Sequence, residues 1–204
     1  ERPSFPIPQI EFQKKSLVRI NNLSYKFDSE VLFENINLEV EAGDRILIHG
    51  PIGVGKTTLL KLIIGELKPS SGEIKLNTDK IGYLPQSFTL KNPNQRCRDY
   101  LKEQYGLIED DIKKILSKLK ISEVFNLPIG NLSFGEIRRL QIAAILFKNP
   151  ELLILDEPTN HLDVYTVEEL VQALNQYKGA IIFVSHDKFF IEDISPNKEI
   201  FLIK

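Results

Sequence analysis

The sequence predicts an α/β fold in which helices cover a largely parallel sheet. Short apolar runs recur along the chain at residues 45–49, 81–84, 152–155, 181–184 and 200–203. Several of these runs lack the alternation of a half-exposed strand, which indicates strands that are buried on both faces. Segments with helical periodicity lie between the runs, and this alternation of strand and helix is typical of α/β proteins.

The first elements are expected to form an antiparallel β subdomain. Residues 17–27 and 31–40 carry dispersed apolar side chains and end at polar turns. We expect two antiparallel strands here, connected near residues 28–30. The run at 45–49 ends abruptly in glycine, and we expect a helix at 57–67 to follow it.

The middle of the chain is expected to be helical. Residues 112–119 and 164–174 place apolar side chains at helical spacing, whereas residues 87–132 contain no strong strand pattern. The helix expected at 133–148 becomes almost wholly apolar from residue 142 to residue 147, so it should be deeply buried. A helical subdomain is therefore expected at about 87–145.

The composition restricts the classes of function. Of the 204 residues, 42% are hydrophobic and 26% are charged, which fits one globular domain able to bury its own core. A net charge of −2 argues against binding nucleic acid through the overall field. The single cysteine, Cys97, cannot form an internal disulfide, so a cytoplasmic location is expected. A membrane helix needs roughly 20 apolar residues, and no apolar run approaches that length, so no direct membrane insertion is expected.

A glycine-rich segment follows the run at 45–49. It matches the phosphate-binding pattern G-x-x-x-x-G-K-[ST] between an expected strand and an expected helix, which is the context that supports such a loop. Its glycines allow backbone N–H groups to surround phosphate oxygens, Lys56 supplies a positive charge and Thr57 a ligand for Mg²⁺. The alternative is a glycine turn with an incidental lysine. The predicted nucleotide contacts here are Gly50, Pro51, Ile52, Gly53, Val54, Gly55, Lys56, Thr57 and Thr58.

Two carboxylates follow the run at 152–155. Asp156 is expected to hold Mg²⁺, usually through water, and Glu157 to take a proton from the attacking water. The alternative is an acidic loop after a core strand.

Residues 156–163 read DEPTNHLD and strongly resemble ATP-binding cassette (ABC) ATPases, particularly the soluble ABC-F branch. The resemblance covers essentially the whole chain and implies a P-loop NTPase fold of the ABC type. In the terms of that family, Gln86 closes the Q-loop and touches the metal and the attacking water. Residues 132–136 (LSFGE) match the signature motif, and residues 160–163 fall at the D-loop. His186, within the switch segment 184–190, is expected to contact the γ-phosphate.

The family also stacks an aromatic side chain on adenine. Phe27 occupies that place, with Tyr25 as the second choice, and both are expected on the same face of one strand. The alternative is that both are core aromatics. Preference for ATP over GTP is an expectation from the family.

Ser133 and Glu136 have the spacing of a capping box that opens a helix, and a helix start is a site for anions. In the family, Ser133 and Gly135 face the γ-phosphate held by a second ATPase domain. The alternative is a simple capped helix. Phe134 stands where the family usually has glycine; because Ser133 and Gly135 remain, phosphate binding is expected to persist, with altered closure or turnover. Ile52 replaces a small polar residue, with its main effect expected at the interface with the partner.

Other polar residues receive structural interpretations. His49 ends a core strand and is expected to be structural, the family motif implies for His161 a D-loop role without proton transfer, and Cys97 is expected to be inert. Arg138 and Arg139 are interpreted as solvated or paired within the chain, with contact to a partner as the alternative. Four lysines are interpreted as complementing a helix dipole rather than binding RNA; these are Lys113, Lys114, Lys118 and Lys120.

The expected reaction is ATP + water → ADP + phosphate with ATP and Mg²⁺ bound, catalysed by Lys56, Glu157 and His186. Competence is expected to require a second ABC ATPase domain, either fused in a longer protein or as a second copy. The absence of methionine also predicts a longer protein. Residues 1–16 are then the end of an interdomain linker and residues 17–204 the ATPase domain.

The interval between Gln86 and Ser133 is too short for the helical arm of the family's first domain, which favours the C-terminal domain. The expected role is action on the ribosome, through parts outside this chain, in translation regulation or antibiotic resistance. The alternative is the ATP-binding subunit of a membrane transporter with a transmembrane permease.

Overall fold

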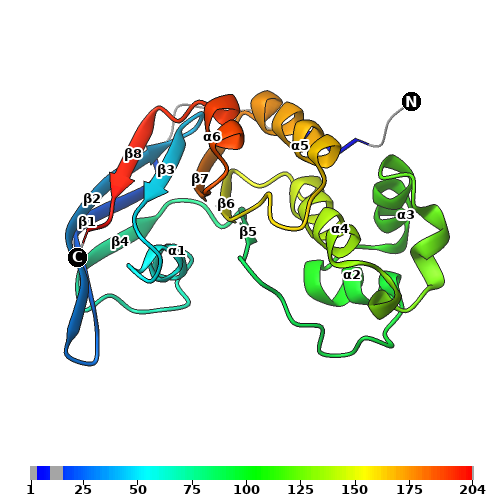
Figure 1. The fold of residues 1–204 in the computed structure, drawn as a ribbon, viewed down its shortest axis with the longest axis horizontal. Coiled ribbons are helices and arrows are strands. Elements are labelled where there is room, and N and C mark those ends of the chain that lie inside the picture. Colours follow the sequence, from blue (N-terminus) through cyan, green and yellow to red (C-terminus); the bar gives the residue numbers. More distant parts are fainter. Residues whose placement is uncertain (1–3, 10–15, 204) are drawn as a thin grey trace. The chain divides into compact units, whose positions relative to one another are not determined.

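Residues 4–9 and 16–203 are described by the computed structural model of the protein (Figure 1). They fall into two units, each with its own packing. The helical unit contains Ser87–Asn149, Thr159–Tyr177 and residues 4–9, and the sheet unit contains the other described residues. The predicted linker at 1–16 lies largely outside the described residues, and its assignment stays a prediction.

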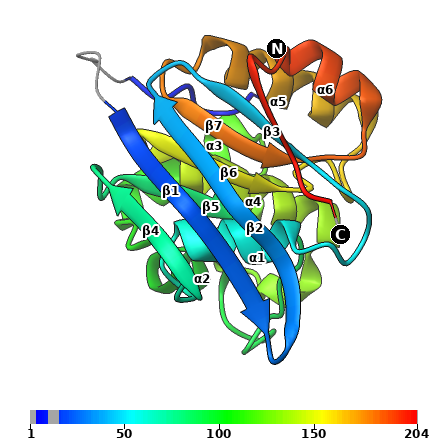
Figure 2. The ribbon, with the colours of Figure 1, turned by 90° about the vertical axis from the view of Figure 1, so that its left-hand side faces the viewer.

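The sheet unit begins with an antiparallel sheet. β1 (Ser16–Phe27) pairs with β2 (Glu30–Glu41) on one side and with β4 (Ser71–Leu76) on the other, as Figure 2 shows. The two predicted strands and their antiparallel pairing are confirmed. β4 was not predicted, because most of its side chains are exposed and its sequence shows no apolar alternation.

The second sheet of this unit is parallel throughout, as predicted. Its strand order is β5-β6-β7-β3-β8, and every neighbouring pair runs parallel. Every residue of β6 and β7 is buried, which explains why their sequences lack alternation. The strands are β3 (Arg45–His49), β5 (Ile81–Leu84), β6 (Leu152–Asp156), β7 (Ala180–Val184) and β8 (Lys198–Phe201).

α1 (Lys56–Ile63) joins the two sheets of this unit in one apolar core. Its Leu59 and Leu60 belong to the same buried cluster as residues of both sheets. The helix predicted to reach residue 67 ends at Ile63 instead. Gly65 lies in the left-handed region with φ of 79°, and its N–H bonds to the carbonyl of Leu62, which is how helices commonly end. The unit's second helix is α6 (Lys188–Ile194).

The helical unit contains α2 (Cys97–Tyr105), α3 (Glu109–Lys118), α4 (Phe134–Phe147) and α5 (Val164–Gln176). Short 3₁₀ helices, η1 (Ser122–Asn126) and η2 (Ile129–Asn131), connect α3 to α4. As predicted, residues 87–132 contain no strand. In the described part of the chain, no helix is both long and apolar enough to cross a membrane.

Two charge assignments can be tested in this unit. The first turn of α3 is acidic, and ion pairs join Lys113 to Glu109 and Lys114 to Asp111. The interpretation of these lysines as part of a dipole-complementing helix is thus confirmed for α3. Of the two forms of the arginine prediction, solvated or paired within the chain, Arg138 fits the second, because it is 1% exposed on α4 and interacts with the phenol of Tyr105.

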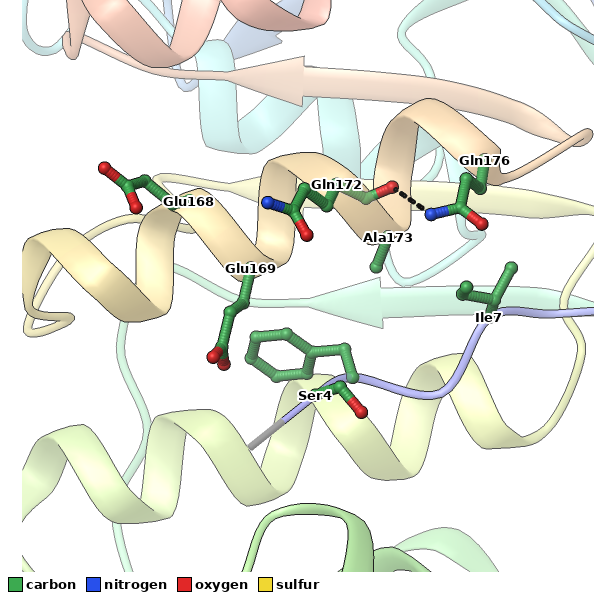
Figure 3. A pocket seen from close by; sticks show the side chains of 8 residues that line it. Ser4, Ile7, Glu168, Glu169, Gln172, Ala173 and Gln176 are labelled. Carbon is green, nitrogen blue, oxygen red and sulfur yellow. Dashed lines mark hydrogen bonds between the residues drawn. The ribbon is translucent and has the colours of Figure 1, made fainter. Parts of the chain in front are cut away.

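The N-terminal strap, residues 4–9, packs on the helical unit and has neither helical nor strand structure. Its ends are held where the Ser4 N–H bonds to the Lys118 carbonyl at 3.1 Å and the Gln9 N–H bonds to Asn149 Oδ1 at 3.0 Å. The Phe5 side chain is buried. Figure 3 shows the strap beside α5, where a cavity of about 250 Å³ remains between them.

Candidate nucleotide-binding site

Apart from Phe27, which ends β1 of the antiparallel sheet, the sequence-predicted site residues of the sheet unit lie at one edge of the parallel sheet. β3 leads into the glycine-rich loop, β6 ends at Asp156, β7 precedes His186 and β5 precedes Gln86. Carboxyl ends of parallel strands share one edge, and that edge is where α/β sheets bind their ligands. Sequence positions that are far apart are therefore brought together here.

The glycine-rich loop is shaped by two glycines. A Cβ on Gly50 would lie 2.6 Å from Val54 Cγ1 and 2.8 Å from the Leu202 carbonyl, so only glycine fits. Gly55 is the N-cap of α1 with a φ of 104°, a conformation that glycine adopts readily. The first turn of α1 carries no acidic residue. The positive end of the helix dipole is consequently open to an anion.

Lys56 lies against this loop. Its ammonium donates to the carbonyls of Gly50 at 2.6 Å and Pro51 at 3.0 Å. An ammonium has three donors, so these contacts use two of them. The positive charge is thereby fixed against the loop that precedes α1. Ile52, in the same loop, is almost wholly exposed.

Thr57 and Asp156 form the most direct long-range contact of the site. The Thr57 hydroxyl donates to Asp156 Oδ2 at 2.6 Å, although 99 positions separate the two residues. A hydroxyl and a buried carboxylate are hard oxygen donors of the kind that Mg²⁺ prefers. Gln86 is exposed just beyond Leu84, which pairs with Leu155 beside Asp156. The donor chemistry of these side chains fits the predicted magnesium ion.

Glu157 is held by the segment after β7. Its backbone has a φ of 50°, uncommon for a residue with a side chain, and its N–H bonds to the Val184 carbonyl at 2.9 Å. Glu157 Oε2 accepts from the His186 N–H at 3.2 Å, and Oε1 lies 3.3 Å from His186 Nε2. Glu157 is 6% exposed, whereas the His186 side chain is mostly exposed. The two residues predicted to act on water and on phosphate thus contact each other.

Sequence reasoning missed one residue that positions His186. Asp187 is the N-cap of α6, and its Oδ1 accepts from the Phe190 N–H at 3.1 Å. This cap fixes where the helix begins and therefore where His186 lies. The sequence did contain a signal for this role, because aspartate is one of the residues preferred at the N-cap position of a helix.

The two candidate adenine-stacking aromatics differ in the structure. Phe27, at the end of β1, is 63% exposed, whereas Tyr25 is half-buried and stacks on Phe33 with ring centroids 6.2 Å apart. The alternative that both are core aromatics is wrong for Phe27. Tyr25 packs against the core cluster of the sheet unit.

In the helical unit, the predicted capping box is confirmed. Ser133 is the N-cap of α4, and its Oγ accepts from the Glu136 N–H at 3.2 Å. The Glu136 carboxylate in turn accepts from the Ser133 N–H at 2.8 Å and the Ser133 hydroxyl at 2.7 Å. These hydrogen bonds, first that of the hydroxyl and then that of the backbone, lower the pKa of Glu136. An open cavity of about 440 Å³ borders this turn.

His49 and Cys97, which were predicted to have structural rather than catalytic roles, lie in surroundings that fit those roles. His49 stacks on Phe201 with ring centroids 4.5 Å apart, and its Nε2 lies 2.9 Å from Glu199 Oε2. Burial raises the pKa of the Cys97 thiol to about 12, which keeps it protonated and unreactive. Across residues 4–9 and 16–203, histidine, cysteine and acidic side chains form no group of three or more that could hold a metal ion.

A parallel sheet with a phosphate-binding loop after β3 and two carboxylates at the end of β6 defines a P-loop nucleotide-binding domain. Residues 33–160 match the family model described as ABC transporter, and the chain belongs to this family of ATP-binding domains. Its curated relatives include members of the F branch, which confirms the resemblance seen in the sequence.

Two curated relatives show the extent of the likeness. The chain is 38% identical over 194 residues to ABC transporter F family member 2 of Arabidopsis thaliana, covering 92% of this chain and 28% of the relative. It is 37% identical over 198 residues to the probable ATP-binding protein YbiT of Escherichia coli O157:H7, covering 92% and 37%. The chain therefore spans well under half the length of these relatives.

A solved structure of the ATP-binding subunit of an ABC transporter shares the fold, with a TM-score of 0.80. The two chains are 22% identical, and the match covers 92% of this chain and 86% of the other. The predicted fold class is confirmed. Family membership supports ATP binding and hydrolysis, and domains of this family function as dimers or paired with another ABC domain.

Proposed function

We propose that this chain hydrolyses ATP to ADP and phosphate in a Mg²⁺-dependent reaction, as one of two paired ATPase domains. The observation that carries the proposal is the Thr57–Asp156 hydrogen bond of 2.6 Å, at the sheet edge where Glu157 also contacts His186. A metal-binding pair, a general base and a phosphate loop are thereby combined in one unit.

The binding roles follow from the loop geometry. Lys56 and the N–H groups at the start of α1 bind the β- and γ-phosphates, while Phe27 is exposed and suited to stack on adenine. Thr57, Gln86 and, through water, Asp156 would hold Mg²⁺. When bound, the metal neutralises the negative charge of the phosphates. The remaining nucleotide contacts are proposed for Gly50, Pro51, Ile52, Gly53, Val54, Gly55 and Thr58.

The hydrolytic step is assigned to Glu157 and His186. The oxygen of water attacks the γ-phosphorus, and the bond from that phosphorus to the bridging oxygen of ADP breaks. Glu157 orients the water and takes its proton, while His186 supports the γ-phosphate. The contact of 3.3 Å between His186 Nε2 and Glu157 Oε1 keeps both groups at the same place.

The helical unit supplies a second set of contacts in this proposal. Ser133 and Gly135, at the exposed start of α4, bind the γ-phosphate of a nucleotide held by another ABC ATPase domain. That domain is fused in a longer protein or is a second copy of this chain. A single chain is then expected to bind ATP but to hydrolyse it slowly.

For the biological role, we propose the second ATPase domain of a cytoplasmic F-branch protein that acts on the ribosome. The F-branch relatives support this proposal. The ribosome contacts would lie outside this chain, and the outcome would be translation regulation or antibiotic resistance. A second candidate is a transporter subunit that works with a permease. The likeness to an ATP-binding subunit of an ABC transporter is the observation that supports this candidate. A gene that encodes two ATPase domains without membrane helices would separate the first candidate from the second.

The decisive experiment is Glu157→Gln in the paired assembly. ATP binding should persist, and turnover should fall by roughly 10²- to 10⁴-fold, the range for loss of a general base. Glu168→Gln, at an exposed position of α5, is the matched control and should leave turnover unchanged. Undiminished hydrolysis by the Glu157 variant would remove this residue from its role.

The full-length Glu157→Gln protein should also sediment with ribosomes in the presence of ATP. Its absence from the ribosomal pellet, with ATP binding verified, would exclude the ribosomal role.

A further inference from the structure

Phe134, the first residue of α4, is an exposed aromatic that nevertheless contacts two other rings. It is 63% exposed, with ring centroids 5.5 Å from Phe88 and 5.8 Å from His161. Both distances lie within the range of about 4.5–7 Å for interacting aromatic pairs, and the interplanar angles are 44° and 38°. All three residues belong to the helical unit, and His161 lies in the loop 159–163 that leads into α5.

A second contact joins the same loop to the start of α4. A Cβ on Gly135 would lie 2.6 Å from the carbonyl oxygen of His161, so the backbone of the loop rests directly on the helix start. His161 has a φ of 67°, a conformation that a residue with a side chain adopts only when its surroundings hold it. The ring of Phe134 and the backbone at Gly135 both contact His161 and supply those surroundings.

The loop has further support at both ends. The Leu162 N–H bonds to the Thr159 carbonyl at 3.1 Å, and Asp163 caps α5 by accepting from the Thr166 N–H at 3.0 Å. Between these supports, the peptide and the ring of His161 both contact the start of α4. The start of α4 therefore contacts His161 in two ways, through the side chain of Phe134 and through the backbone at Gly135.

We propose that Phe134 is a positioning residue that fixes the loop 159–163, through His161, against the start of α4. The loop and the turn at Ser133–Gly135 then meet the nucleotide of a partner domain as one surface. This inference rests on the proposed function, because the partner's nucleotide is where that surface acts. The energetic logic is preorganisation, since misplacement of a positioning group by about 1 Å can lower a rate by as much as about 100-fold.

The contact can be tested by the NMR spectrum of this chain with labelled histidine, which needs no ATP. The chain has three histidines, so each ring can be followed separately. Phe134→Ala should move the His161 signals and speed amide exchange in the loop 159–163, while the His49 signals stay in place. Phe201→Ala is the matched control, because it removes the ring stacked on His49 and should move only the His49 signals.

The functional consequence is tested in the paired full-length protein. Phe134→Ala and Phe134→Leu should lower kcat for ATP hydrolysis roughly 10-fold, by loss of orientation, with KM for ATP changed little. Phe134→Tyr retains the ring, so its kcat should equal that of the unaltered protein. Ile108→Ala, at an equally exposed position of the helical unit, should have no effect.

Three outcomes would overturn the proposal. These are unmoved His161 signals in Phe134→Ala, moved signals with unchanged kcat, and an increased kcat in Phe134→Gly, which would identify the ring as an obstacle to pairing. Absence of hydrolysis by the unaltered paired protein would instead refute the proposed function. Equal hydrolysis by the unaltered paired protein and by its Phe134→Ala variant would refute only the role of Phe134.

Discussion

The nucleotide edge of the sheet unit and the capped turn of the helical unit are both polar, but they are assembled differently. At the edge, Thr57 reaches Asp156 across 99 positions and Glu157 reaches the His186 segment across 29. At the turn, Ser133 and Glu136 are three positions apart and satisfy each other. The contacts of the nucleotide edge therefore form only when the whole sheet unit folds. The hydrogen bonds of the capped turn, by contrast, need only the four consecutive residues 133–136.

This difference predicts where a substitution acts. At the buried edge, removal of a polar group should alter chemistry within one chain. At the exposed turn, removal of a polar group should alter local stability and the activity of a pair. Four substitutions test this contrast, in order of decreasing expected effect.

Thr57→Ala should have the largest effect, because it removes a hydroxyl hydrogen-bonded to a buried carboxylate and a proposed metal ligand. Loss of a group that orients metal ligands typically lowers metal affinity or activity by roughly 10- to 100-fold, so a loss of Mg²⁺-dependent ATP affinity in that range is expected. Titration of the single chain with ATP, with and without Mg²⁺, measures this. Thr57→Ser is the control that keeps the hydroxyl; equal loss in both variants would contradict the interpretation.

Gly135→Ala should destabilise the helical unit by about 1–3 kcal/mol, the usual cost of an added methyl group in a tight contact. The new Cβ would lie 2.6 Å from the His161 carbonyl, so the loop must shift. Denaturant unfolding measures the change in the free energy of unfolding. A cost below about 0.5 kcal/mol, the range of ordinary surface substitutions, would show that the loop yields easily.

Ser133→Ala removes the N-cap of α4 and should cost about 1 kcal/mol of stability. ATP binding by the single chain should not change, whereas turnover of the pair should fall. Both are measured on the same protein preparation, with Ser133→Thr as the conservative control. Weakened ATP binding by the single chain would contradict the division of roles between the two regions.

The smallest effect is a dependence on pH. The pKa of Glu136 is lowered in the folded chain by hydrogen bonds from Ser133, so its contribution to stability is present above the unfolded pKa of about 4.3. This contribution is lost as pH falls through the folded pKa. The free energy of unfolding of Glu136→Gln should therefore decline less between pH 7 and pH 3 than that of the unaltered chain. Parallel pH profiles would show that the carboxylate is not held in this way.

Much of the fold could be predicted because burial leaves a pattern in the sequence. β6 and β7 are buried at every position, and their apolar runs in the sequence predicted both strands. β4 left no such pattern, since its exposed residues are held by pairing with β1 rather than by burial of its own side chains. Propensity and periodicity do not record that kind of support.

The candidate site shows the same division. The loop 50–57 and the Asp156–Glu157 pair are local patterns, so their chemistry could be predicted directly. The contact between Glu157 and His186 could not, because it depends on the pairing of β6 with β7, in which Asp156 lies opposite Val184. The burial of Arg138 was also missed, since a charged residue on a helix is exposed far more often than buried.

The N-terminal strap has a practical consequence for shortened versions of this protein. β1 looks like the natural first element, yet Phe5 is buried against the helical unit and the strap is hydrogen-bonded at both ends. A version that begins at Ser16 would lose this buried ring and both hydrogen bonds, and a domain destabilised in this way exposes apolar surface that promotes aggregation. The residues that precede the first strand should therefore be kept in any recombinant version intended to remain dispersed at high concentration.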